Sequence, residues 1–143
     1  MKQLSKSQAL EDGLELFRQS ETHSRYRVTD IYTYLQLPIK HHKIRIYYEF
    51  NKPVGLITWC WLSDTNAELF LQDKYHPTES DYEHDSPMSE KQLWGMEFIA
   101  PYGHTRKMIR AIKRSIEETH GPQKVNWRRF HSRDKRRTKR FQA

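Results

Sequence analysis

The sequence predicts an α+β fold in which helices flank one β-sheet. Residues 43–50 alternate between apolar and polar side chains, and residues 54–62 form an apolar run of strand length. An amphipathic pattern after residues 101–103 predicts a long helix beside this sheet. The 143 residues are enough for one core, so we expect a single domain over residues 1–143.

The first helix is predicted to open at Ser5, because Gln8 follows three residues later as in a capping box. It places three apolar side chains on one stripe: Leu10, Leu14 and Phe17. The helix ends at about Ser20. A loop carrying Ser20 and His23 is therefore expected directly after its last turn.

A second, short helix is predicted to begin after Thr29. Its expected buried residues are Ile31, Tyr34 and Leu35. It should stop near Pro38, because proline disfavours helical geometry in the residue before it. Both helices precede the first strand.

Residues 43–50 and 54–62 predict two strands joined by a turn at residues 51–53, which together form a hairpin. In the first strand Ile44, Ile46, Tyr48 and Phe50 are expected on the buried face. The second strand is apolar on both faces, so we place it centrally in the sheet.

The second half of the chain begins with residues 73–90, which are acidic and lack helical or strand periodicity, so we expect an exposed loop. Residues 92–100 predict a third strand, followed by a turn at residues 101–103 and the long helix. The apolar stripe of that helix consists of Met108, Ile109, Ile112 and Ile116. Gly121 and Pro122 should end it. A last strand is predicted at residues 125–130, before a basic tail at residues 131–143.

The charge of the chain is +7 and unevenly distributed. Residues 101–143 carry 14 basic and 3 acidic side chains, whereas residues 73–100 carry 2 and 7. Such a field attracts acidic partners, and nucleic acid, an anionic membrane and an acidic carrier protein all qualify. Charge alone does not choose among them.

The lone cysteine, Cys60, excludes a disulfide within the chain and favours a reducing compartment. No secretion signal begins the sequence, and no stretch approaches the roughly 20 apolar residues of a membrane span. We therefore expect a cytoplasmic protein without a transmembrane segment. Because Cys60 lies within an apolar strand, it is expected to be a core residue and not a nucleophile.

Glu97 is a carboxylate among apolar residues of the third predicted strand. Strict alternation puts it on one face with Leu93, Gly95 and Ile99, and puts Met96 and Phe98 on the other face. Because burying an unpaired carboxylate is costly, Glu97 requires either a structural ion pair or a place in a functional site. The sequence leaves both readings open.

The turn at residues 101–103 is a candidate phosphate site. Gly103 lets a ligand approach the backbone, and the first turn of a helix presents free N–H groups. Arg106 and Lys107 oppose the helix dipole there, and an anionic ligand would compensate. The alternative is a solvated basic face on an amphipathic helix.

Several motifs together resemble the toxin-activating lysine acyltransferases that modify RTX cytolysins. They are Ser20-x-x-His23, the Pro53-Val54 hairpin ending at Trp61 and Ser63, and the eight-residue run at 96–103, Met-Glu-Phe-Ile-Ala-Pro-Tyr-Gly. The resemblance covers about residues 14–129. It implies a GNAT-like α/β sandwich, with a twisted, mostly antiparallel sheet and flanking helices. It also implies transfer of a fatty acyl group from acyl carrier protein to internal lysines of an RTX protoxin, and relatives suggest a homodimer.

Carried over residue by residue, the resemblance implies that His23 is the catalytic histidine, Ser20 its nearby serine and Glu97 its carboxylate. The family generally has aspartate at the last position, and glutamate is one methylene longer. Aminolysis of a thioester needs a base, since only about 0.04% of lysine is neutral at pH 7, and histidine is suited to that task. Direct transfer and transfer through an acyl-His23 both remain open.

The donor would be an acyl carrier protein, which is acidic and whose 4'-phosphopantetheine arm begins with a phosphate. Arg106, Lys107 and Arg110 are the predicted docking residues, together with Gly103. No bound cofactor is expected. The histidines show no metal-ligand spacing such as His-Glu-x-x-His, so no metal site is predicted.

Two other functions compete with this one. The basic residues at 128–140 are typical of a nucleic-acid-binding module, although a solvated tail explains them too, and we do not expect nucleic acid to be the partner. A GNAT-like enzyme that uses acyl-coenzyme A is the second. It is weakened because no Arg/Gln-x-x-Gly-x-Gly/Ala segment precedes the long helix.

Overall fold

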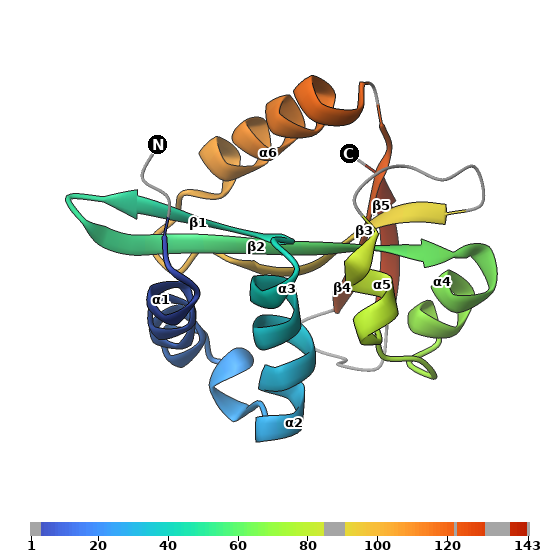
Figure 1. Ribbon diagram of the computed structural model, residues 1–143, viewed down its shortest axis with the longest axis horizontal. Helices are drawn as coiled ribbons and strands as arrows, with labels where there is room; N and C mark the ends of the chain where they lie inside the picture. The colour runs from blue at the N-terminus through green and yellow to red at the C-terminus, as the bar shows by residue number, and fades with distance from the viewer. Residues whose placement is uncertain (1–3, 85–90, 122, 131–137, 143) are drawn as a thin grey trace.

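The structure is a computed structural model that describes residues 4–84, 91–121, 123–130 and 138–142. Helices cover both faces of a five-stranded sheet with strand order β1-β2-β3-β4-β5 (Figure 1). The strands are β1 (Ile44–Glu49), β2 (Lys52–Ser63), β3 (Lys91–Ile99), β4 (Val125–Phe130) and β5 (Thr138–Gln142). All neighbouring strands are antiparallel except β3 and β4, which run parallel. The predicted α+β class with a mostly antiparallel sheet is confirmed.

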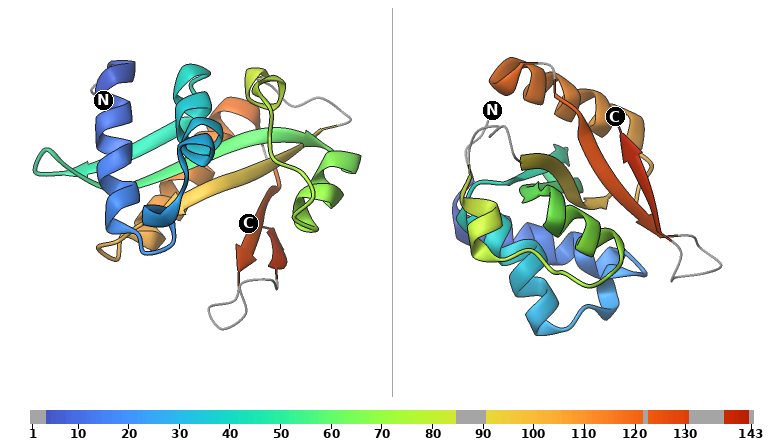
Figure 2. Two further views of the ribbon diagram at one scale, coloured as in Figure 1. Left: turned by 90° about the horizontal axis from the view of Figure 1, so that it is seen from below. Right: turned by 90° about the vertical axis from the view of Figure 1, so that its right-hand side faces the viewer.

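The two faces of the sheet carry different helices (Figures 1 and 2). On one face lie α1 (Lys6–Gln19), α2 (Val28–Ile31), α3 (Leu37–Lys40), α4 (Asp64–Leu71) and α5 (Glu79–Glu83). The other face is covered by α6 (Thr105–His120). Short 3-10 and π segments, η1 (His23–Arg25) and η2 (Tyr32–Gln36), complete the first face. None of the described helices is long and apolar enough to cross a membrane.

The first helix begins as predicted. Ser5 caps α1 by accepting a hydrogen bond from the Gln8 N–H at 3.1 Å. The Gln8 side chain bonds Asp12 instead of completing a capping box. The predicted apolar stripe is wrong at Leu14, which is 39% exposed, because the buried face turns to Ala9, Gly13, Leu16 and Phe17.

The second helix extends further than predicted. Residues 28–40 form one continuous helical stretch, and Pro38 lies inside it instead of ending it. The stretch changes to π-helical hydrogen bonding over η2, where the Leu37 N–H reaches back to the Tyr32 carbonyl. Pro38 stands in the first turn after this change, where a missing N–H is tolerated. Tyr34 and Leu35 are buried as predicted.

The hairpin of β1 and β2 is confirmed, but its turn lies earlier than predicted. Phe50 and Asn51 have φ angles of 50° and 64°, so they form the turn, and Lys52 already pairs with Glu49. Phe50 is fully exposed at this tip and not on the buried face of the strand. Strand β2 pairs on both sides, as expected for a central strand.

Two polar segments contain structure that was not predicted. Residues 79–83 of the acidic segment form α5, and its Asp81 and Tyr82 are buried at 3% and 0% exposure. The cap explains this: Asp81 accepts hydrogen bonds from Thr78 and from the Tyr75 hydroxyl. Residues 85–90 of the predicted loop lie outside the described residues. In the predicted basic tail, residues 138–142 form β5 against β4, while residues 131–137 and 143 lie outside.

Gly95 marks the close approach of β4 to β3. An added Cβ would lie 2.0 Å from Cζ3 of Trp127, a ring that is hard to move because it packs beside Trp61 and Val125. We expect Gly95→Ala to lower the free energy of unfolding by about 1–3 kcal/mol, measured by urea denaturation. Gly13→Ala is the comparison, since its Cβ would lie 2.7 Å from a methyl group of Leu35, a less severe overlap, and alanine favours a helix. Equal stabilities of the two variants would contradict this packing argument.

Candidate active site

His23 lies in the tight turn that follows α1. Ser20 ends the helix, with its N–H donating to the Phe17 carbonyl, and the Ser24 N–H then bonds the Ser20 carbonyl at 2.8 Å. The Ser20 hydroxyl oxygen also accepts the His23 N–H at 3.4 Å. These bonds fold η1 back onto the sheet and leave the His23 side chain 12% exposed.

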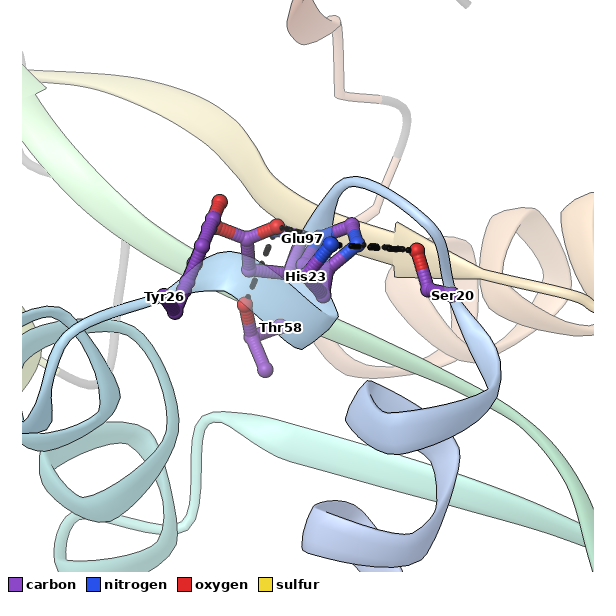
Figure 3. Close-up of polar contacts among 5 residues, drawn as sticks. All are labelled: Ser20, His23, Tyr26, Thr58 and Glu97. Carbon is purple, nitrogen blue, oxygen red and sulfur yellow. Dashed lines mark hydrogen bonds and ion pairs between the residues drawn. The ribbon is translucent and has the colours of Figure 1, made fainter.

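Both ring nitrogens of His23 are hydrogen-bonded (Figure 3). Nδ1 lies 2.6 Å from the Ser20 hydroxyl, and Nε2 makes a short bond to Oε2 of Glu97. A carboxylate can only accept, so with Glu97 ionised the ring proton belongs on Nε2. Nδ1 is then free to accept the Ser20 proton. The structure thus brings together the three predicted residues Ser20, His23 and Glu97.

A β-bulge in β3 aims Glu97 at His23. Between the pairs Ile57–Phe98 and Trp59–Gly95, β3 advances three residues while β2 advances two. The extra residue reverses the alternation of side chains, as bulges near active sites often do. The predicted alternation is therefore wrong before the bulge: Glu97 shares the face of Met96, while Gly95 points to the opposite face. After the bulge it is correct, since Glu97 and Ile99 share one face.

Glu97 is 6% exposed, and each of its carboxylate oxygens has a partner. His23 binds Oε2, and the Tyr26 hydroxyl donates to Oε1 at 2.8 Å. Its backbone N–H donates to the Thr58 hydroxyl at 3.0 Å, which fixes the bulge (Figure 3). No lysine or arginine pairs with Glu97 among the described residues. The partners that the sequence required for this carboxylate are therefore His23 and Tyr26.

Aromatic rings hold the imidazole in place. The centroid of the His23 ring lies 5.1 Å from that of Phe17 and 5.0 Å from that of Tyr26, and Tyr26 packs edge-on against Phe17. Sequence reasoning missed Tyr26. Tyr26 follows His23 by three residues, as Ser20 precedes it by three, and this spacing was the sequence signal that pointed to it.

Burial, followed by the adjacent Glu97 carboxylate, raises the pKa of Tyr26 far above its ordinary value. The hydroxyl therefore stays protonated and remains a hydrogen-bond donor. Tyr34 packs beside Tyr26 with ring centroids 6.1 Å apart, and its hydroxyl lies 2.6 Å from Nδ1 of His76. Burial also raises the pKa of Tyr34. Several neutral polar groups thus line the region next to His23.

Arg128 belongs to the fold and not to a free basic tail. Its guanidinium donates to the Phe70 carbonyl at 2.7 Å, lies 4.0 Å from the centroid of the Phe70 ring and faces Asp73 at 3.5 Å. Its side chain is only 12% exposed. This charge lies near enough to Tyr26 and Tyr34 to act against the rise in their pKa values. One of the basic residues assigned to a nucleic-acid module is therefore partly buried and bonded within the fold.

The predicted donor-binding residues lie on the other face of the sheet from His23. Arg106, Lys107 and Arg110 are exposed on α6. Lys107 lies 3.8 Å from Glu49, whereas neither arginine has a partner within the described part of the chain. Gly103 has a φ of 87° and open space around it, but its N–H already donates to the Ala100 carbonyl. The structure groups these residues near one end of α6 without placing them beside the catalytic candidates.

Two further groups can be assigned from their surroundings. Cys60 is fully buried, and burial raises the pKa of its thiol well above the ordinary value, so it is unsuited to act as a nucleophile. Among the described residues, His41, Glu79 and Glu83 lie close enough together to hold a cation. The Lys40 ammonium already binds Glu79 at 2.6 Å, so a cation would have to displace it. We assign no metal role to this group.

The sequence is similar to known proteins of one family. The profile of the RTX toxin acyltransferase family matches residues 2–142. An uncharacterized protein of Synechocystis sp. is 25% identical over 99 residues, which are 68% of this chain. The match spans 64% of the length of that relative.

Proposed function

The chain belongs to the RTX toxin acyltransferase family, and from this premise we propose that it acylates internal lysines of an RTX protoxin. The donor in this proposal is acyl carrier protein loaded with a fatty acid. The observation that carries it is His23, which is hydrogen-bonded on one side to Ser20 and on the other to Glu97. A cytoplasmic location, a single domain and a homodimer stay predictions.

In the proposed reaction His23 is the general base. The lysine nitrogen attacks the thioester carbon, so that a C–N bond forms as the C–S bond breaks. Ser20 passes its proton to Nδ1 while it accepts the proton of the amine, and the imidazolium then protonates the departing thiolate. Glu97 stabilises the transient positive charge on His23. An acyl group on His23 itself is the alternative route, and it would have to form at Nδ1, because Nε2 faces Glu97.

The donor phosphate is proposed to bind near Gly103, with Arg106 and Arg110 as its main charges and Lys107 shared with Glu49. The thioester must then reach His23 from the opposite face of the sheet. We propose that the arm passes beside β3 where its described pairing with β4 ends, at Gly95 and Trp127, two residues before Glu97. Beyond that point β4 and β5 turn away from the other strands (Figure 2).

The rival functions lose support. The basic C-terminal segment contributes a strand, β5, and its Arg128 is partly buried and bonded to the Phe70 carbonyl, both of which are unlike a free nucleic-acid-binding tail. Acyl-coenzyme A as donor would also present a thioester and phosphates. Discriminating it from a carrier protein requires a direct comparison of the two donors.

The test is to incubate the protein with a purified RTX protoxin and acyl carrier proteins of several chain lengths, and to map mass shifts on lysines. We expect acylation that is much faster with acyl carrier protein than with acyl-coenzyme A. Arg106→Ala/Arg110→Ala should raise KM for the carrier protein, whereas Lys113→Ala, also exposed on α6, should not. Absence of acylation, together with salt-sensitive DNA binding, would favour the nucleic-acid reading.

A further inference from the structure

We propose that Tyr26 is a positioning residue that holds the Glu97 carboxylate against His23. This inference rests on the proposed function, since it assigns a role within the same site. Tyr26 does not touch the ring nitrogen that would receive the proton. Its hydroxyl contacts the far oxygen of Glu97, and so it acts on catalysis through that carboxylate (Figure 3).

The need for such a residue follows from the length of the Glu97 side chain. A glutamate has three rotatable bonds, and the last is broad and weakly restricted. If only Oε2 were bound, the carboxylate could swing about that contact. The Tyr26 hydroxyl on Oε1, 2.8 Å away, removes this freedom, while Thr58 fixes the backbone of the same residue.

Tyr26 is itself well held. It caps η1, where its N–H donates to the His23 carbonyl at 3.1 Å, so that the turn placing His23 also places Tyr26. Its ring packs against Phe17, His23 and Tyr34. The hydroxyl remains a donor throughout the physiological range because burial and Glu97 disfavour its ionisation. A fixed donor of this kind sets the orientation of a carboxylate without competing for the imidazole proton.

Tyr26→Phe tests the proposal, because it removes the hydroxyl and keeps the ring. We expect kcat for lysine acylation to fall on the order of tenfold, with KM for both substrates unchanged. The downfield proton NMR signal of the His23 Nε2–H should shift upfield as its bond to Glu97 loosens. That signal requires neither substrate nor activity, so it reports on Tyr26 even if the proposed function fails.

A double-mutant cycle with Glu97→Asp makes the test sharper. Aspartate is one methylene shorter, so we expect that it does not reach His23 and Tyr26 together. In the Glu97→Asp variant, Tyr26→Phe should therefore lower kcat only slightly further. Tyr48→Phe is the matched control, because its hydroxyl also donates to a carboxylate, Asp12, at 2.5 Å. It should leave kcat and the His23 signal unchanged. An unmoved signal in folded Tyr26→Phe, or losses that add in the double variant, would overturn the proposal.

Discussion

His23→Ala is expected to reduce kcat for lysine acylation by roughly 10²- to 10⁴-fold, the range that a positioned general base contributes. The reason lies in the geometry of Nδ1, which is the acceptor for the proton that the lysine must lose. Without it, Ser20 has no acceptor and water must take the proton. Initial rates with saturating acyl carrier protein and protoxin measure this effect.

The variant should keep its fold and its donor binding. His23 packs beside Phe17 and Tyr26, and truncation leaves Glu97 still bonded to Tyr26. His120→Gln is the control, since this histidine packs on Trp61 at the end of α6, on the other face of the sheet. Acylation that is undiminished in His23→Ala would remove His23 from the mechanism.

Regular alternation and helical periodicity predicted most of the elements of this fold. Strand β1 and helices α1 and α6 lie where apolar residues repeat with the period of the element, and β2 and β3 lie where apolar runs of strand length predicted them. Helix α5 was not predicted because it is a short polar segment that a specific contact stabilises. Helix α5 depends on the Asp81 cap with Thr78 and Tyr75, and such a cap carries no apolar period.

The candidate site could be predicted as a set of residues but not as a geometry. Ser20 and His23 are close in sequence, and a loop after α1 was expected to carry both. Glu97 lies 74 positions away from His23, and strict alternation placed it on the face of Gly95 instead of that of Met96. The bulge that corrects this depends on backbone pairing with β2 and on Thr58. Tyr26 had no signal beyond its spacing, because an aromatic residue in a turn is more often a packing residue.

Glu97→Gln is expected to lower kcat by roughly 10²- to 10⁴-fold while leaving the protein folded. In Ser-His-Asp enzymes the corresponding amide substitution costs about 10⁴-fold, because the histidine is held in the wrong tautomer. The same logic applies here. An amide nitrogen facing Nε2 would require that nitrogen to accept, which moves the ring proton to Nδ1 and removes the base. The measurement is kcat at saturating donor and protoxin.

Stability separates this loss from damage to the fold. A neutral amide is less costly to bury than a carboxylate, so the unfolding midpoint of Glu97→Gln should equal or exceed that of the wild type. Glu79→Gln provides the matched control, because Glu79 also pairs with a histidine, His41, at 3.1 Å, but lies on α5. It should leave kcat unchanged. Wild-type kcat in a folded Glu97→Gln would show that His23 does not depend on this carboxylate. The expected loss of kcat would show that Glu97 holds the ring proton of His23 on Nε2.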